Sequence, residues 1–524
     1  QANGISSHLP ALALAASLLM VVLAAALSQS RGGAVALMVA VVTLSVVYWR
    51  WRLVDARYLF GFAAVGVALL GVLSIYGYEK VAARLDDLTD GSLEAVDRDA
   101  GRREVWSANV DAIRAGGLTG AGVGSHMELS PLYLERPSDR HSTHAENGYL
   151  QIATETGWLG VALLAAGIGL CGGWCVACWR RLQIPAEQIC FGATAAGLAA
   201  SLAHSVVDFV WYIPATMSLT LVLAACTLRL SQFALPEARR EEVQPVLRRP
   251  RWLELTAATT LAGIWAVYVY AAPALASLLW DRYLNVELAH SQLARRISAA
   301  RIAGTEPPDA SSRLHLVESM VRHLEETLNW NPQFALAHFE LAQRSLDLFE
   351  LRQQDGANAM GVVQIAEAVA ASQFETEGEL RAWLGRALGE NAALLYQARR
   401  HARRSVELCP LHGEAYVLLA NLSFLDPGPQ PSGRQLAEQA LRVRPRQSAV
   451  LFEIGRQRLI AGDIENAFDF WAQCSNNPGP HQLRIVQAMA GSWMPAAEYI
   501  RYFQPDWQTL REVWTRYKLR GRPE

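Results

Sequence analysis

Lysine is almost absent from this chain of 524 residues, which is long enough for more than one domain. Lys80 and Lys518 are the only lysines, so nearly all of the 47 basic residues are arginine, a bias that we attribute to genomic base composition. An excess of charge of either sign is absent too, because the 47 basic residues are balanced by 49 acidic ones. This balance argues against a nucleic-acid-binding protein.

Signals for secretion and for disulfide bonding are also missing. No charged segment followed by a short apolar run and a cleavage site is visible at the start. The first residue is Gln rather than Met, so we expect the sequence to be truncated at its N-terminus. The seven cysteines do not suggest a disulfide framework. The spacing of Cys171, Cys175 and Cys178 could suggest a metal site, but small residues on a membrane helix explain it better.

Apolar runs are abundant in the first half of the chain. A helix that crosses a bilayer needs about 20 apolar residues. Seven runs meet this need, near 9–27, 33–49, 58–77, 157–178, 189–207, 209–230 and 252–279. The arginine-rich segments WRWRLVDAR, WRRLQIPAEQ and RREEVQPVLRRPR fall at alternate connections, so all three can face the cytoplasm. The loop 78–156 and everything after residue 280 then face the periplasm, which predicts a multi-pass protein of a bacterial inner membrane.

The second half shows the pattern of soluble helices in repeats. Three segments each contain a proline and, ten positions later, a small residue: Ala342, Ala420 and Gly455. This spacing resembles the tetratricopeptide repeat, and an irregular helical bundle is the alternative. The sequence therefore predicts an all-α protein with three parts: a transmembrane domain at 1–279, a linker at 280–312 and a periplasmic repeat domain at 313–524.

Ionisable side chains cluster just before the run at 157–178. Asp139, His141, His144 and Glu146 lie close together in the sequence, but their spacing fits no strong zinc signature. The nearby segment GAGVGSH resembles a nucleotide loop only superficially, because no strand precedes it and it faces the periplasm.

A second ionisable pair, His204 and Asp208, falls at a turn between two membrane helices. Ionisable groups at membrane depth are candidates for function, and a turn pair near the membrane interface is the alternative interpretation.

Three segments, in this order and spacing, resemble the O-antigen ligase and polymerase family. The segment LSQSRGGAVAL contains Arg31, and the segment GRREVW, which a Gly-x-Gly turn follows, contains Arg102. Asn147 is followed, after nine residues, by Gly157 and Gly160. This last spacing is similar to the family motif of His, Asn or a similar residue, nine residues and Gly-x-x-Gly.

The resemblance, which covers roughly residues 10–230, implies a reaction. It implies that a glycan moves from undecaprenyl diphosphate to an acceptor hydroxyl without a metal or nucleotide cofactor. The acceptor would be a glycan, a lipid A-core or a protein. Arg31 and Arg102 match the family's phosphate-binding positions, and Arg103 is a neighbour. Arginine can bind a diphosphate through two parallel hydrogen bonds. A helix-end arginine that extends to water is the alternative for Arg31.

The sequence departs from the family motif where the histidine should precede Asn147. Glu146 stands at that position, and His144 lies two residues earlier. We assign His144 as the general base, because an ordinary histidine pKa of about 6.5 lies near neutral pH. Glu146 would hold His144 or the acceptor, and exchanged roles are the alternative. Asn147 would orient a sugar hydroxyl or cap the following helix, and His141, His204 and Asp208 would support the site from further away.

The resulting hypothesis is a membrane glycosyltransferase whose repeats bind a protein partner. The rival hypothesis is a non-catalytic scaffold that a membrane domain anchors and whose repeats recruit proteins for polysaccharide assembly or export. Arg31, Arg102 and a base near Asn147 favour the enzyme, whereas the replaced histidine favours the scaffold. Ligase, polymerase and protein O-glycosyltransferase share the donor chemistry and differ only in the acceptor.

Overall fold

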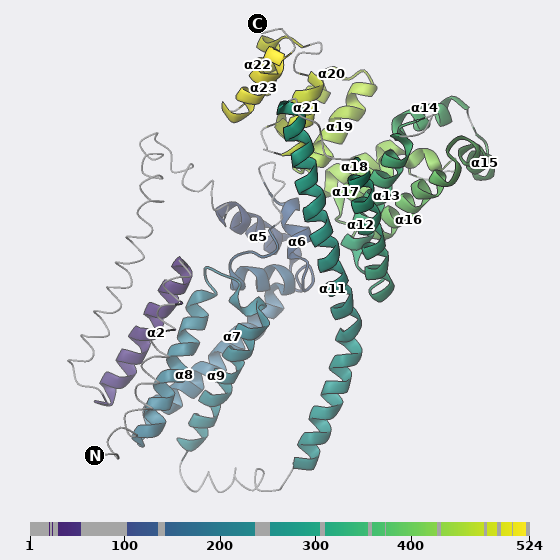
Figure 1. Cartoon of the computed structure of the whole chain (residues 1–524). Helices are drawn as coiled ribbons and strands as arrows, with labels where there is room; N and C mark the ends of the chain where they lie inside the picture. Colours follow the sequence, from purple (N-terminus) through teal and green to yellow (C-terminus); the bar gives the residue numbers. More distant parts are fainter. Residues whose placement is uncertain are drawn as a thin grey trace, which may run out of the picture. The chain divides into compact units, whose positions relative to one another are not determined.

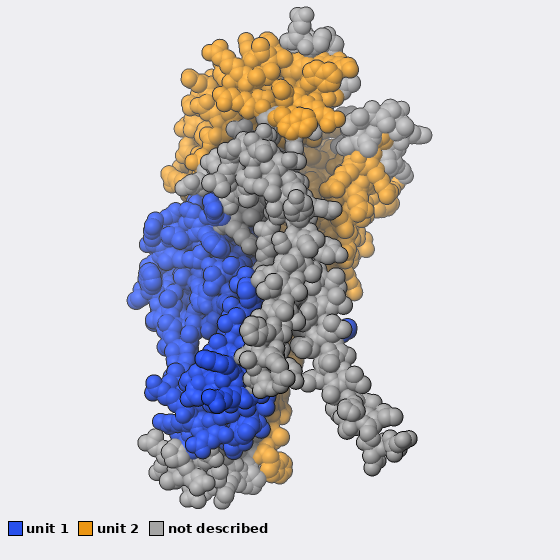
Figure 2. All heavy atoms as spheres, turned by 90° about the vertical axis from the view of Figure 1, so that its left-hand side faces the viewer, with its two compact units in different colours: residues 1–134, 141–250 blue, residues 135–140, 251–524 orange. Residues whose placement is uncertain are grey.

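The computed structural model describes residues 30–53, 102–134, 142–235, 252–303, 310–354, 359–372, 374–426, 431–475, 479–489, 494–505 and 507–519, together with Met20 and Ala24. Every secondary-structure element in this part of the chain is helical, which confirms the predicted all-α fold class (Figure 1). The chain divides into two compact units, coloured separately in Figure 2. Unit 1 comprises residues 1–134 and 141–250, and unit 2 comprises residues 135–140 and 251–524.

Unit 1 combines long apolar helices with shorter ones. The long helices are α2 (Arg31–Arg50), α7 (Gly148–Arg181), α8 (Pro185–His204) and α9 (Pro214–Phe233). The shorter ones are α5 (Arg102–Gly116), α6 (His126–Leu129), η1 (Ser130–Leu132) and η2 (Val210–Tyr212). Proline begins both α8 and α9, where its fixed φ suits the first helical turn. Helix α2 packs along α8, and α9 packs against both α7 and α8 (Figure 1).

Small residues allow the long helices of unit 1 to approach each other closely. A Cβ added to Gly192 on α8 would lie 3.1 Å from Cδ1 of Tyr48 on α2. The Tyr48 hydroxyl donates a hydrogen bond to the carbonyl of Ile189 at 3.2 Å. A Cβ added to Gly197 would lie 2.7 Å from Cδ1 of Leu223 on α9. Such close contacts are typical of helices that associate within a membrane.

The arginine-rich ends of two long helices come together. Trp51, which follows the last residue of α2, lies against Trp179 near the end of α7, with ring centroids 5.7 Å apart. Both rings border a buried core at this end of the unit, which consists of Val47, Cys178, Leu182, Phe191, Leu230 and Ala234. Two of the predicted cytoplasmic segments thus share one end of unit 1, and the N-terminus of α7 lies at the other.

Among the described residues, four helices are long and apolar enough to cross a membrane. They are Gly32–Arg50, Gly148–Arg181, Pro214–Phe233 and Thr256–Ile297. The predicted run at 189–207 forms most of α8, which is not among these four. The runs at 9–27 and 58–77 lie almost entirely outside the described residues. The apolar helices make the chain a multi-pass membrane protein.

Unit 2 begins with one very long helix and continues as a series of shorter ones. Helix α11 spans Trp252–Ala303. The following helices are α12 (Ala310–Trp330), α13 (Ala335–Gln354), α14 (Val362–Ser372), α15 (Glu377–Leu388), η3 (Gly389–Asn391), α16 (Ala392–Leu408), α17 (Gly413–Asn421), η4 (Ser423–Leu425), α18 (Gly433–Val443), α19 (Ser448–Ile460), α20 (Ile464–Ser475), α21 (Pro480–Met489), α22 (Ala496–Phe503) and α23 (Trp507–Leu519).

The C-terminal part of α11 packs into the core of unit 2. Tyr283 is 1% exposed, and its hydroxyl donates a hydrogen bond to the Glu340 carboxylate on α13 at 2.7 Å. The range 280–312, predicted as a linker, is therefore helical up to Ala303, and part of it lies in this core. The predicted boundary at residue 279 also differs from the boundary between the two units, which falls at residue 250.

Pairs of helices pack against each other along the rest of unit 2, as α12 with α13, α17 with α18 and α19 with α20 (Figure 1). Gly455 shows why a small residue is needed in such a pair, because a Cβ there would lie 2.5 Å from Cδ1 of Trp471 and 3.1 Å from the carbonyl of Ala467. The Trp471 indole donates a hydrogen bond to the carbonyl of Phe452 at 3.0 Å. Gly462 makes the turn between these helices with φ of +80°.

Candidate functional site

The N-terminus of α7 carries the stretch that the sequence marks as an active-site edge. Asn147 is the N-cap, and its side-chain oxygen accepts hydrogen bonds from the amides of Tyr149 and Leu150, both at 3.0 Å. These bonds satisfy two of the donors that a helix start leaves unpaired. The structure thus shows the capping role of Asn147, while its predicted contact with substrate stays a prediction.

Helix α7 is kinked at the first glycine of the motif. Gly157 has φ of +63° and ψ of −162°, a conformation that is essentially restricted to glycine. A Cβ at this position would lie 2.5 Å from the carbonyl oxygen of Leu118. Gly120, in the same loop, has φ of +69° and would place a Cβ 2.6 Å from the carbonyl oxygen of Glu155. The loop after α5 therefore lies directly on the kink, and only glycines fit both sides of the contact.

Backbone hydrogen bonds fasten this loop to the kinked helix. They join Ala121 N to Thr154 O at 3.1 Å, Gly122 N to Glu155 O at 2.8 Å and Leu159 N to Leu118 O at 3.0 Å. The carbonyls of Thr154 and Glu155, next to the kink, thus accept hydrogen bonds from amides of the loop. The segment GAGVGSH, which superficially resembles a nucleotide loop, has this structural role.

The second glycine of the motif, Gly160, has a different function. A Cβ at Gly160 would overlap the side chain of Thr156, whose hydroxyl donates a hydrogen bond to the carbonyl of Ile152 at 2.6 Å. The Gly-x-x-Gly spacing therefore combines a kink with space for a threonine in the adjacent turn of the helix.

The imidazole of His144 is held between aromatic rings that follow α8. It stacks on Phe209 with ring centroids 4.2 Å apart and planes at 11°, and the ring of Tyr212 meets it edge-on at 5.7 Å. Nδ1 lies 3.0 Å from the hydroxyl oxygen of Thr143. Nε2 forms no hydrogen bond to any residue that the structure describes. In the tautomer in which Nδ1 donates to Thr143, Nε2 is free to accept a proton.

Glu146 has an unusual backbone conformation. Its φ is +51°, in the left-handed region that costs a non-glycine residue about 1–3 kcal/mol. The preceding residue, Ala145, is fully buried, and its carbonyl accepts a hydrogen bond from the Trp106 indole at 3.0 Å. The Ala145 amide donates to the side-chain oxygen of Gln151 at 3.2 Å. These contacts hold the strained turn in place, and strained residues of this kind are concentrated at functional sites.

A buried polar cluster beneath this turn was not predicted. Glu155 is 1% exposed, and its carboxylate accepts hydrogen bonds from the Gln151 amide at 3.1 Å and from the Tyr212 hydroxyl at 3.2 Å. Gln151 and Glu155 are one turn apart on α7, a helix that is otherwise mainly apolar. Two polar residues one turn apart in an apolar helix were the signal in the sequence that could have indicated this cluster.

The cluster continues through α5 and α6. The Thr154 hydroxyl donates a hydrogen bond to the side-chain oxygen of Asn109 at 2.8 Å, and the Asn109 amide lies 3.0 Å from Nε2 of His126. His126 is 1% exposed. Burial lowers the pKa of His126, and the nearby charge of Glu155 opposes this change. Polar contacts thus connect α5, α6 and α7 under the loop.

His204 and Asp208 form a pair at the turn after α8, with Nε2 3.4 Å from Oδ2. The backbone carbonyl of Asp208 accepts a hydrogen bond from the amide of Gly148 at 3.1 Å. A Cβ added to Gly32, near the start of α2, would lie 3.4 Å from the His204 ring. This turn therefore contacts the N-termini of both α2 and α7.

The predicted arginines begin two helices. The backbone of Arg31 begins α2, where the Ser30 hydroxyl caps the helix by accepting a hydrogen bond from the amide of Gly33 at 3.0 Å. The backbone of Arg102 begins α5, and Arg103 is exposed. Because Gly32 lies at the His204 turn, the backbone of Arg31 is at the same end of unit 1 as the N-terminus of α7.

The structure leaves part of the predicted set undescribed. Asp139 and His141 lie outside the described residues. Within the part of the chain that is described, no three or more histidine, cysteine, aspartate or glutamate side chains are grouped closely enough to hold a metal ion. That the reaction needs no metal stays a prediction.

Comparison with known proteins identifies the family of the N-terminal part. Residues 15–165 match the family model described as O-antigen ligase. The matched stretch contains the predicted arginines, both candidate bases, Asn147 and both motif glycines, whereas His204 and Asp208 lie beyond its end. No curated protein matches the chain significantly. The similarity to the O-antigen ligase family therefore extends over residues 15–165 and ends within α7.

Proposed function

We propose that the protein is a membrane glycosyltransferase that transfers or polymerises a glycan from an undecaprenyl-diphosphate-linked donor onto an acceptor hydroxyl. The O-antigen ligase domain indicates an enzyme of the glycan ligase or polymerase type with lipid-linked substrates. The observation that best supports the proposal is the way in which the imidazole of His144 is held. It is fixed between Phe209 and Tyr212, keeps Nε2 without a hydrogen bond to a described residue, and lies three residues before the capped start of α7.

In the proposed reaction, the acceptor oxygen forms a bond to the anomeric carbon of the donor sugar. The bond between that carbon and the diphosphate oxygen breaks, and its electron pair leaves with undecaprenyl diphosphate. The hydroxyl proton passes to Nε2 of His144. Arg31 and Arg102 stabilise the charge of the leaving group, with Arg103 beside them. In this scheme neither a metal ion nor a nucleotide takes part.

The proposed reaction takes place on the periplasmic side of a bacterial inner membrane. This assignment is supported by the positions of the helix ends in unit 1. Arg50 and Arg180 lie at the end that contains the Trp51–Trp179 contact, whereas His144 and the His204 turn lie at the other end. Basic residues are enriched on the cytoplasmic side of membrane proteins. The unit 2 helices after α11 would then also lie in the periplasm.

We also propose that these helices form tetratricopeptide-like repeats that bind a partner. The packing of α17 with α18 and of α19 with α20 supports this interpretation. The close contact between Gly455 and Trp471 is of the kind that requires a small residue in the first helix of such a repeat.

One observation favours the alternative of a non-catalytic scaffold. Glu146 stands at the position that carries histidine in the family. A scaffold would keep the fold of the site without its base. The two hypotheses therefore differ in whether a side chain before Asn147 accepts a proton.

The experiment that tests the proposal compares His144→Ala with Glu146→Ala. The chain, reconstituted in lipid with an undecaprenyl-diphosphate-linked glycan and an acceptor, is assayed for transfer across a range of pH. His144→Ala is expected to lower the rate at least about a hundredfold, as the loss of a general base does. His315→Ala is the control, because this side chain is 78% exposed on α12, and it should leave transfer unchanged.

Two outcomes would change the assignment. If Glu146→Ala is the more damaging change and a His144→Ala/Glu146→His protein is active, the family position has kept the role of the base. If neither alanine variant affects transfer, neither side chain is the base and the assignment of the site is refuted. If the chain performs no transfer while melting like a folded protein, the scaffold hypothesis is favoured.

A further inference from the structure

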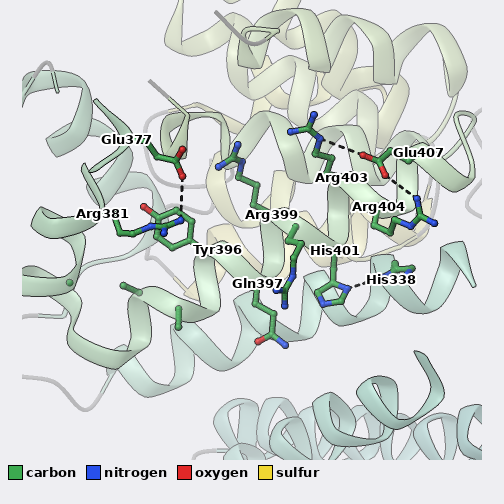
Figure 3. A pocket seen from close by; sticks show the side chains of 14 residues that line it. His338, Glu377, Arg381, Tyr396, Gln397, Arg399, His401, Arg403, Arg404 and Glu407 are labelled. Atoms are coloured by element: carbon green, nitrogen blue, oxygen red, sulfur yellow. Dashed lines mark hydrogen bonds and ion pairs between the residues drawn. The ribbon is translucent and has the colours of Figure 1, made fainter. Parts of the chain in front are cut away.

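Unit 2 contains a pocket of about 1090 Å³ that arginines dominate. Its walls come from α13, α15 and α16, and Figure 3 shows the labelled side chains around it. The arginines are Arg381, Arg399, Arg400, Arg403 and Arg404. Two glutamates, Glu377 and Glu407, are the acidic residues of the lining. Five positive and two negative groups give the lining a net charge of +3 when its histidines are neutral.

Ion pairs within unit 2 compensate only part of this charge. Glu407 is shared between Arg403 and Arg404, at 3.5 and 3.1 Å, and these two side chains remain 56% and 45% exposed. Glu377 contacts Arg381 at 3.3 Å. Arg399 pairs with Asp426 on the connection after α17. Arg400 forms no ion pair with a residue that the structure describes. The pocket therefore keeps guanidinium groups available to an anion.

Two histidines line the same pocket, and their hydrogen bonds define which nitrogens carry protons. Nε2 of His338 lies 3.1 Å from the carbonyl of Pro332 and must donate to it, because a carbonyl only accepts. In neutral His338, Nδ1 is then an acceptor, and it lies 2.8 Å from Nδ1 of His401, which must donate. This arrangement leaves Nε2 of His401 as an acceptor for a hydroxyl group. Burial and the neighbouring His338 and Arg400 lower the pKa of His401 to about 4, which is consistent with a neutral ring.

The chemistry of the walls distinguishes between classes of ligand. Among the described residues that line the pocket there is no leucine, isoleucine, valine, methionine or phenylalanine, and the small apolar ones are Ala392, Ala393 and Gly385. Peptides and proteins usually anchor in such grooves through large apolar or aromatic side chains. This pocket instead offers planar guanidinium groups, imidazoles and the ring of Tyr396, over which Arg381 lies at 4.9 Å. Its volume is at the upper end for small-molecule pockets, which suits several sugar units better than a single ion.

We propose that this pocket binds a segment of anionic oligosaccharide. The arginines hold the carboxylate or phosphate groups with charge-assisted hydrogen bonds, and Nε2 of His401 accepts a hydrogen bond from a sugar hydroxyl. The pocket itself indicates a ligand with several negative charges, and the inference rests on the proposed function only where it identifies that ligand as a glycan. Binding needs no transfer chemistry, so it can be tested without a donor lipid.

The test is calorimetric titration of the whole chain in detergent micelles. The probe is an oligomer of galacturonic acid, compared with a neutral malto-oligosaccharide of equal length and with an oligoglutamate peptide of equal charge. The galacturonate oligomer is expected to bind, and to bind more weakly as salt is added. The neutral oligosaccharide should bind at least tenfold more weakly. Tighter binding of oligoglutamate would overturn the glycan assignment in favour of an acidic peptide, and absence of galacturonate binding would overturn the site.

Variants locate the binding in the pocket. Arg400→Gln should weaken galacturonate binding about tenfold or more, the usual effect of losing one hydrogen bond to a charged group. Ala393→Glu adds a carboxylate to the exposed wall and should weaken binding similarly. Arg434→Gln is the matched control, because this arginine lies on α18, is 76% exposed and pairs with a glutamate one turn away. An equal loss in the Arg434→Gln protein would show non-specific attraction and refute the proposal. A protein that binds but transfers nothing would count only against the proposed transferase activity.

Discussion

The contact between Gly157 and the loop after α5 permits a quantitative prediction. Gly157→Ala would force alanine into a conformation that costs about 1–3 kcal/mol. Its Cβ would also lie 2.5 Å from the carbonyl oxygen of Leu118, so that the loop must move, at an overpacking cost of about 1–3 kcal/mol. The expected loss of stability is therefore about 2–6 kcal/mol. If unit 1 behaves like a domain of 150–250 residues, the melting temperature should fall by at least about 4 °C.

Gly167→Ala in the same helix is the matched control. Among the described residues, no atom beyond the neighbouring backbone of its own helix lies within 4 Å of a Cβ at Gly167, so this change should leave stability unchanged or raise it by up to about 1 kcal/mol. Thermal unfolding of the purified protein in detergent measures both variants. Limited proteolysis should also show faster cleavage between residues 117 and 122 in the Gly157→Ala protein. Equal melting temperatures and equal cleavage in the two variants would refute the argument that the kink requires glycine.

The other predictions concern pH and the helix cap. Because the pKa of His401 is lowered to about 4, below its ordinary value of about 6.5, folded unit 2 binds fewer protons than the unfolded chain. The contribution of a neutral His401 to the free energy of unfolding should therefore be fully present above about pH 6.5 and be lost as the pH drops toward 4. The melting temperature should fall between pH 7.5 and pH 5.5, and it should fall less in a His401→Gln protein than in the unchanged protein. An unchanged decrease would contradict this reasoning. Asn147→Ala should destabilise α7 by about 1 kcal/mol, because the helix loses its cap. Asn147→Asp keeps the oxygen that accepts the cap hydrogen bonds. An Asn147→Asp protein that melts normally but no longer transfers glycan would show that the side-chain amide contacts substrate.

Some elements of unit 1 were predictable because they depend on local sequence. The apolar run at 33–49 forms most of α2, and the run at 157–178 lies within α7. Asn147 could be identified as a possible cap from its place before an apolar run. The motif glycines could be identified by their spacing, but the sequence did not show that Gly157 makes a kink and Gly160 makes room for a side chain.

The parts that were missed depend on contacts between distant residues. Thr154 and Asn109 are 45 positions apart and meet only because the loop after α5 lies on α7. His126, the third member of this chain of contacts, appeared in the sequence as the end of a glycine-rich segment. The arginine pocket of unit 2 likewise requires α13, α15 and α16 to come together. Periodicity along the chain carries no information about such contacts.

The strained turn at Glu146 is formed by residues within the family domain. Ala145, which precedes it, is held by the Trp106 indole and the Gln151 side chain. All of these residues lie within residues 15–165. The turn is therefore built entirely from residues of the matched stretch.

The position of His144 depends instead on residues outside that domain. Phe209 and Tyr212, which hold its ring, follow α8 and lie beyond residue 165. A base displaced by two residues can act only if the protein fixes the new side chain, since a positioned group is what acid–base catalysis requires. The turn after α8 supplies this support, and its residue Asp208 accepts a hydrogen bond from Gly148 at the start of α7. One element thus contacts both the ring of the proposed base and the helix start beside it, so a base at position 144 would be fixed in place although Glu146 stands at the family's histidine position.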